Sequence, residues 1–140
     1  MNTIFLISHD LGIGGTEKNI RYLVKYLSQC QWNIYIYCIG PETSNSMSFS
    51  EPNIHVINTK YSASNISQLF KLIYSILRNI KIYNPDILLS FLTTPSIVTI
   101  LVNFFARIPH IASERCHPIL QPGQSRFWKF LRYLLYCRLQ

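Results

Sequence analysis

Short apolar runs alternate along the chain with longer segments in which apolar residues recur every three or four positions. The continuous runs predict strands buried on both faces, and the recurring pattern predicts helices with one buried face. The runs predict strands over residues 3–8, 33–39, 54–57, 87–91 and 109–113. The helical pattern predicts a helix that begins at Thr16 as N-cap and runs through Leu27, and further helices over 66–82, 96–107 and 125–138.

Strands and helices mostly alternate in this order, which predicts an α/β fold. The expected architecture is a Rossmann-like, mostly parallel sheet with helices on both faces. A length of 140 residues fits a single domain over residues 1–140. In such sheets ligands bind at the carboxyl ends of the strands, near the point where the strand order switches. The loops that follow the strands are therefore the candidate binding positions.

The composition narrows the partners that such a domain could have. Hydrophobic residues make up 49% of the chain and charged residues only 14%, which excludes a disordered protein. The net charge of +7 favours an anionic partner, either a membrane surface or a phosphorylated ligand. Nucleic acid is not expected as a partner, because the basic residues form no dense run and no recognisable binding motif.

One uncharged segment, residues 87–106, is long enough to cross a bilayer. Residues 93–96, with the sequence TTPS, read as a turn followed by a helix start. The segment is therefore interpreted as a buried strand followed by a buried helix. The N-terminus lacks the basic region and the apolar length of a signal peptide, so we expect a cytoplasmic location.

The cysteines and histidines indicate no metal site. The spacing of the four cysteines fits no known metal motif, and Cys30 and Cys38 are predicted to be buried, reduced thiols. His9 stands beside Asp10 after the first strand, and adjacent side chains point in different directions. The pair is therefore interpreted as capping its loop and not as part of a catalytic triad. The histidines in or next to strands, His55 and His110, are interpreted as structural.

Three glycines, Gly12, Gly14 and Gly15, connect the first predicted strand to the first predicted helix. Such a loop permits a close approach of a ligand to the backbone, and the helix start favours phosphate. No Gly-Lys-Ser/Thr follows, which excludes a Walker A loop. Glu17 replaces the third glycine of the dinucleotide fingerprint, which excludes that motif as well. The alternative is a glycine turn that only tightens packing between strand and helix.

A second group of polar residues, Glu114, Arg115 and His117, follows the fifth predicted strand. Since the carboxyl ends of parallel strands share one edge, these residues are predicted to lie at the same edge as the glycine loop. Arginine can hold a phosphate or carboxylate through two donors, and Glu114 could orient a sugar hydroxyl or pair with Arg115. The alternative is that Glu114 and Arg115 form only a structural ion pair.

The last predicted helix combines a basic stripe of Arg126, Lys129 and Arg132 with aromatic residues such as Trp128. A helix of this kind can lie on an anionic membrane surface. Apolar residues ring most of the helix, however, and this favours the alternative of burial against the sheet or a second domain.

Three stretches together carry a resemblance: SHDLGIGGTEKNIRYLVKYL, NPDILLSFLTTPS and IPHIASERCHP. In this order and spacing they resemble the amino-terminal domain of family 4 glycosyltransferases of the GT-B fold. The resemblance implies one half of a GT-B fold and the retaining transfer of a sugar from a nucleotide sugar, without a metal or other cofactor. The implied acceptor is a glycan or a polyprenyl-linked precursor of capsule or lipopolysaccharide, at the cytoplasmic face of the membrane.

The resemblance also implies roles for particular residues. Gly14 and Gly15, with the helix start at Thr16, would approach the donor diphosphate. Glu114 and Arg115 would line the cleft, with His117 beside it, and the resemblance assigns no catalytic base.

The sequence departs from the family in lacking its carboxyl-terminal donor domain and the E-x7-E motif. We therefore expect half an enzyme, inactive unless a separate chain supplies the donor domain. The alternatives are a non-catalytic module that binds acceptor or membrane and recruits a donor-binding subunit, and an inactive truncated remnant.

Overall fold

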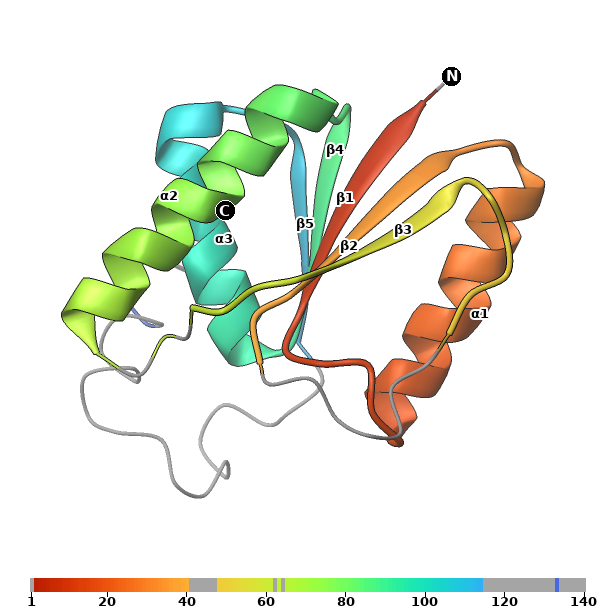
Figure 1. The fold of residues 1–140 in the computed structure, drawn as a ribbon, viewed down its shortest axis with the longest axis horizontal. Coiled ribbons are helices and arrows are strands. Elements are labelled where there is room, and N and C mark those ends of the chain that lie inside the picture. Colours follow the sequence, from red (N-terminus) through yellow and green to blue (C-terminus); the bar gives the residue numbers. More distant parts are fainter. Residues whose placement is uncertain (1, 41–47, 62, 64, 115–132, 134–140) are drawn as a thin grey trace.

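A computed structural model describes residues 2–40, 48–61, 63, 65–114 and 133 of the chain. They form a five-stranded sheet with helices on both faces (Figure 1). The elements are β1 (Thr3–Ser8), α1 (Gly15–Gln29), β2 (Asn33–Cys38), β3 (Ile54–Asn58), α2 (Ile66–Tyr83), β4 (Ile87–Phe91), α3 (Thr93–Ala106) and β5 (His110–Ser113). The predicted α/β, Rossmann-like fold is confirmed, and every strand pair of this sheet is parallel.

The strand order, β3-β2-β1-β4-β5, places β1 at the centre of the sheet. The chain first moves outward from β1 through α1 to β2 and β3, and α2 then returns it past β1 to β4. Because crossovers between parallel strands are right-handed, these two directions of travel put α1 on one face and α2 with α3 on the other, as Figure 1 shows. The strand order therefore switches between β1 and β4.

Successive side chains of β1 point to opposite faces of the sheet, so they contribute to two separate layers of the core. Ile4 and Leu6 pack with Ile20 and Val24 of α1. Phe5 and Ile7, on the opposite face, pack with residues of α2 and α3 that include Leu72, Ile76, Ile80, Val98 and Val102. Every residue of β1 is buried, which explains its continuous apolar run.

Two helix starts differ from the sequence prediction. The N-cap of α1 is Gly14, not Thr16, because the carbonyl oxygen of extended Gly14 accepts a hydrogen bond from Lys18 N at 3.1 Å. Helix α3 begins at Thr93, three residues before the predicted start at Ser96. Pro95 is tolerated there because the N–H groups of a first helical turn have no partner within the helix.

Three further predictions have different outcomes. Within the described ranges no helix is long and apolar enough to cross a bilayer, and residues 87–106 form β4, Leu92 and α3. Cys38 is buried as predicted, whereas the prediction for Cys30 is wrong, because this residue is exposed at the end of α1. The last predicted helix, 125–138, lies outside the described residues apart from Tyr133.

Candidate functional site

The candidate site lies at the carboxyl edge of the sheet, where the strand order switches between β1 and β4. Two strand-to-helix turns flank this point. We call residues 9–14, between β1 and α1, the glycine turn, and residues 91–93, between β4 and α3, the β4 turn. Loops that leave neighbouring strands in opposite directions create the crevice in which ligands of α/β proteins bind.

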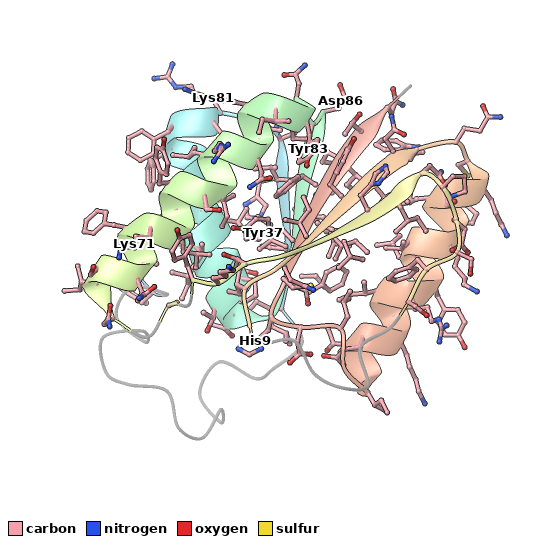
Figure 2. All side chains as sticks on the ribbon, in the orientation of Figure 1. His9, Tyr37, Lys71, Lys81, Tyr83 and Asp86 are labelled. Atoms are coloured by element: carbon pink, nitrogen blue, oxygen red, sulfur yellow. The ribbon has the colours of Figure 1, made fainter. Side chains whose placement is uncertain are left out.

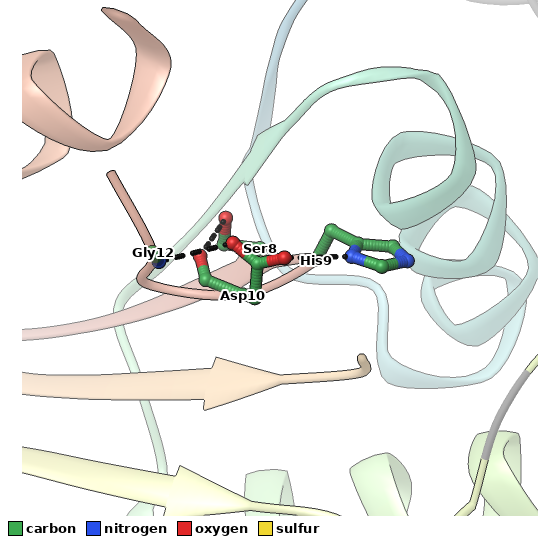
Figure 3. Close-up of polar contacts among 4 residues, drawn as sticks. All are labelled: Ser8, His9, Asp10 and Gly12. Carbon is green, nitrogen blue, oxygen red and sulfur yellow. Dashed lines mark hydrogen bonds and ion pairs between the residues drawn. The ribbon is translucent and has the colours of Figure 1, made fainter. Parts of the chain in front are cut away.

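Asp10 organises the first part of the glycine turn. Its Oδ1 accepts a hydrogen bond from Gly12 N at 3.1 Å, and its carbonyl oxygen accepts one from Ser8 Oγ at 3.2 Å (Figure 3). Its Oδ2 lies 3.3 Å from His9 Nδ1. The loop-capping interpretation of Asp10 is confirmed. The Ser8 hydroxyl bonds to a backbone carbonyl and not to the imidazole, so the three residues do not form a catalytic triad.

The start of α1 has no side-chain cap, since Gly14 is the N-cap. Gly15 and Thr16 are the first two helical residues, and their N–H groups have no intrahelical partner. A Cβ on Gly15 would meet no atom within 4 Å, so Gly15 adjoins open space. A Cβ on Gly14 would instead overlap the carboxylate at the flexible end of the Glu17 side chain. The start of α1 thus has backbone N–H groups without an intrahelical partner at Gly15 and Thr16. The negatively charged carboxylate of Glu17 already lies close to Gly14.

Gly40 supports the glycine turn from β2, a role that sequence reasoning missed. Its N–H donates to the carbonyl oxygen of His9. A Cβ at this position would lie 2.6 Å from His9 Nδ1 and 2.7 Å from His9 O. Only glycine therefore fits here without movement of the backbone, and the available signal was a glycine directly after the second predicted strand.

The β4 turn contains no glycine and is strained. Leu92 has φ 71° and ψ 166°, a combination that only glycine adopts readily. Its N–H donates to the carbonyl oxygen of Ser113 at 3.1 Å, and its carbonyl oxygen accepts from Ser96 N at 3.1 Å. These two bonds hold the strained residue between β5 and the first turn of α3.

A buried polar network lies beneath the β4 turn. Ser90 Oγ donates to Ser96 Oγ at 3.0 Å and lies 2.8 Å from Nε2 of His110. Both serines are fully buried. Burial also lowers the pKa of His110 from 6.5 to about 4, so the imidazole is neutral at neutral pH. These contacts support the structural interpretation of His110, while His55 is exposed and stacks on Tyr35 at 5.0 Å.

Glu114 follows β5 directly and lies at the same edge as both turns. Its Oε2 accepts a hydrogen bond from Thr93 Oγ1 at 3.1 Å, which links β5 to the first residue of α3. Arg115 and His117, the other residues predicted for this edge, lie outside the described residues. So do Arg126, Trp128, Lys129 and Arg132, the predicted membrane-facing residues. In the part of the chain that the structure describes, no group of three histidine, cysteine, aspartate or glutamate side chains is placed to hold a metal ion.

Comparisons with known proteins bear on the fold. No family model and no curated protein matches the sequence. Among solved structures, the fold is similar to a glycosyltransferase from Rickettsia africae ESF-5, with 20% identity and a TM-score of 0.65. It is also similar to MurG from Acinetobacter baumannii, with 15% identity and a TM-score of 0.60. UDP-GlcNAc 2-epimerase from Methanocaldococcus jannaschii, with 15% identity, gives a TM-score of 0.63.

The chain has the fold of one half of a GT-B protein. The three matches cover 79%, 81% and 96% of this chain, but only 29%, 35% and 37% of the respective neighbours. The chain thus spans about a third of the length of these neighbours. At such identities the likeness is one of fold, and it confirms the predicted GT-B half-domain.

Proposed function

We propose that this domain is the amino-terminal, acceptor-side half of a retaining glycosyltransferase related to family 4. Its substrates would be a nucleotide sugar and a glycan or lipid-linked acceptor, as in the assembly of capsule or lipopolysaccharide. A GT-B half-fold similar to those of a glycosyltransferase and of MurG supports the proposal. The observation that carries it is the open space at Gly15, on an uncapped helix start beside the switch in strand order.

The donor diphosphate would bind at Gly14, Gly15 and Thr16. Free N–H groups and the positive end of the α1 dipole favour an anion there. Glu17 opposes this, because its carboxylate lies close to Gly14. Binding would therefore need either a shift of the Glu17 side chain or a cation from another element. Glu114 and Arg115 would line the cleft, with His117 next to them, and Arg115 would supply such a cation.

The remaining donor contacts would come from a second domain, in the same or a separate protein chain. This chain covers only about a third of the length of each neighbouring structure, which supports this proposal. We accordingly expect that the purified 140-residue chain transfers no sugar from any nucleotide sugar. Robust turnover by this chain alone would contradict the half-enzyme proposal.

An NMR titration of the 15N-labelled chain with pyrophosphate tests the anion site. The amide signals of Gly12, Gly14, Gly15 and Thr16 should shift. The start of α2 provides an internal control, because the side chain of its N-cap, Asn65, already accepts a hydrogen bond from Gln68 N at 2.9 Å. Shifts that are equal at both helix starts, or absent from α1, would contradict the proposed diphosphate site.

The variant Gly15→Val separates binding from packing. A side chain at this position fills open space, so the free energy of unfolding should change by less than about 1 kcal/mol. The shifts induced by pyrophosphate at α1 should be lost, because the introduced isopropyl group would occupy the ligand's place. Loss of stability in proportion to loss of binding would support the alternative, a glycine turn needed only for packing.

A further inference from the structure

We infer that the outer edge of β3 pairs with β3 of a second copy of this chain, in the antiparallel direction and with the two Val56 residues opposite each other. This inference rests on β3 and stands apart from the proposed diphosphate site. Strand β3 is an edge of the sheet, and β2 is its partner strand among the described residues. Figure 1 shows β3 at the front of the sheet, with no labelled helix or strand over it.

The backbone of β3 directs alternate residues toward β2 and away from it. Just before the strand, the carbonyl oxygen of Asn53 accepts a hydrogen bond from Ile34 N at 2.8 Å. Just after it, Thr59 N donates to the carbonyl oxygen of Cys38 at 3.2 Å. Since the direction of the backbone groups alternates along a strand, the odd-numbered residues bond to β2. Residues 54, 56 and 58 therefore direct their N–H and C=O groups outward.

The outward groups of β3 form an unprotected edge. The Ile54 N–H donates to the carbonyl oxygen of Glu51 at 3.2 Å. Within the described ranges, the Ile54 C=O and both backbone groups of Val56 and Asn58 have no hydrogen-bond partner. Such groups are a template for a further strand, and edges that avoid pairing carry charges, proline or a bulge. Strand β3, with the sequence IHVIN, has no proline and no Lys, Arg, Asp or Glu, and its register with β2 is unbroken.

The unpaired groups of this edge are complementary to a second copy of themselves. With Val56 opposite its counterpart in an antiparallel pair, the two valines exchange both N–H···O=C bonds. The next outward position sets Asn58 of each copy opposite Ile54 of the other, and the Asn58 N–H can donate to the Ile54 C=O. The pairing thus uses every unpaired N–H of the edge. It leaves out only the Ile54 N–H, which is already bonded to Glu51.

The side chains near this edge favour the same arrangement. The exposed fraction of Val56 is 41%, and the pairing would cover it with Val56 of the other copy. Glu51 precedes β3 and Lys60 follows it, so the antiparallel direction brings each acid toward the lysine of the other copy. The parallel direction would instead bring the two acids together and the two lysines together. Charge complementarity therefore favours a second copy in the antiparallel direction.

Ring contacts hold the edge strand in place before a partner strand arrives. The ring of His55 stacks on Tyr35 of β2, with centroids 5.0 Å apart. Tyr35 in turn stacks on Tyr83 at the end of α2, with centroids 3.9 Å apart. Tyr83 lies between α2 and the sheet (Figure 2). A strand that these contacts already order loses little conformational freedom when it pairs.

The pairing leaves the candidate site open in both copies. It joins the two sheets through β3, whereas the site lies at the carboxyl edge between β1 and β4. Since the strands of the two copies run in opposite directions, the two sites lie at opposite edges of the combined sheet. A second copy therefore does not compete with a donor domain for the same surface.

Sedimentation equilibrium of the full 140-residue chain tests the inference. The apparent mass should rise from monomer to dimer as the protein concentration increases. Amide hydrogen exchange, followed by NMR at the same concentrations, locates the contact. Exchange at Val56 and Asn58 should slow roughly tenfold in the dimer, because their N–H groups become bonded. Exchange at Ile57, whose N–H is directed to β2, should change less.

The variant V56K tests the centre of the contact. It places two lysines directly opposite each other, and like charges in that position are destabilising, so dimerisation should weaken roughly tenfold. The matched control is I111K on the other edge strand, β5, where the exposed fraction of Ile111 is 54%. This variant adds the same charge and should dimerise within about threefold of the unchanged chain, because screening weakens distant charges. Far-UV circular dichroism should confirm that both variants fold, as expected for exposed positions.

Charge reversal tests the direction of the pairing. The variants E51K and K60E should each weaken dimerisation about threefold, because each brings like charges together at both ends of the contact. The double variant E51K/K60E has the net charge of the unchanged chain and restores opposite charges at both ends. Its dimerisation should therefore return to that of the unchanged chain.

Any one of several outcomes would overturn the inference. One is a chain that remains monomeric at concentrations up to about 1 mM. Another is a dimer in which exchange at Val56 and Asn58 is unchanged, which would assign the contact to another surface. Dimerisation that is equally strong in V56K and I111K would show that the centre of β3 is not in the contact. Losses in E51K and in K60E without recovery in the double variant would contradict the antiparallel register.

Discussion

The glycine turn and the β4 turn both connect a strand to the helix that follows it, but they differ in their residues and in their hydrogen bonds. Both connect a central strand to a helix at the carboxyl edge, on the two sides of the switch in strand order. The glycine turn has an aspartate that caps it, two glycines, Gly12 and Gly14, and open space at Gly15 just beyond it. The β4 turn has no glycine, a strained leucine and a closed network of buried hydroxyl groups.

This difference indicates that the two turns have different roles at the carboxyl edge of the sheet. The helix start that follows the glycine turn leaves the N–H groups of Gly15 and Thr16 without an intrahelical partner, so a ligand could approach them without displacing a core side chain. The β4 turn is held by hydrogen bonds from Leu92 to both β5 and α3, which makes this side of the switch in strand order rigid. Strain of this kind persists only where the surrounding structure holds it, and it clusters at functional sites.

The largest expected effect concerns Gly40, which holds the glycine turn in place. The variant Gly40→Ala should lower the free energy of unfolding by about 2–3 kcal/mol, because its Cβ would overlap the backbone of His9. Urea denaturation measures this change. Gly15→Ala is the matched control, and its stability should be unchanged or up to about 1 kcal/mol higher. Equal losses of stability in the two variants would contradict the contrast between a crowded Gly40 and an open Gly15.

A smaller effect concerns the network beneath the β4 turn. Because burial lowers the pKa of His110 to about 4, the unfolded state binds more protons than the folded state between about pH 4 and 6.5. The stabilisation is complete above about pH 6.5 and is lost as the pH falls through this window. Allowing for solvent screening at a partly exposed side chain, we expect a loss of about 1–2 kcal/mol.

Urea denaturation at about pH 7 and about pH 5 measures this dependence. The variant His110→Gln should flatten it, whereas His55→Gln, on the exposed edge strand β3, should keep it. An unchanged slope in His110→Gln would show that the network beneath the β4 turn does not control the pH response. The contrast between the two turns would then rest on Leu92 alone.

The sequence was sufficient to predict the strands and the three described helices, because their burial patterns are local. Alternation and helical repeats fix which residues face the core, as Leu72, Ile76 and Ile80 show. Helix starts were predicted less well. Thr16 has a favourable side chain for an N-cap, but the path of the glycine turn already provides the capping carbonyl at Gly14.

The contacts that define the candidate site depend on strand register, which the sequence did not reveal. His110 lies next to Ser90 because β4 and β5 pair with Leu88 opposite His110, although twenty residues separate Ser90 from His110 along the chain. Gly40 lies against His9 because β1 and β2 end side by side. The placement of Glu114 at the carboxyl edge followed from strand order alone, but its bond to Thr93 did not.

The smallest expected effect is a difference in stability between alanine and glycine variants, which should have opposite signs in the two turns. Ile13 in the glycine turn is 81% exposed and lacks a positive φ, so Ile13→Gly should be less stable than Ile13→Ala by about 0.5–1 kcal/mol. At Leu92, alanine would keep the strained backbone, while glycine would relieve it. Leu92→Gly should therefore be more stable than Leu92→Ala by about 1 kcal/mol, although both lose the leucine side chain.

Thermal and urea unfolding of the four variants measures both differences, and each pair controls for the lost side chain at its own position. The opposite order at Leu92 would mean that its backbone carries no strain in solution. The β4 turn would then hold its shape through hydrogen bonds to Ser113 and Ser96 alone. Rigidity on that side of the switch in strand order would follow from the buried polar network, and not from a conformation imposed on a single residue.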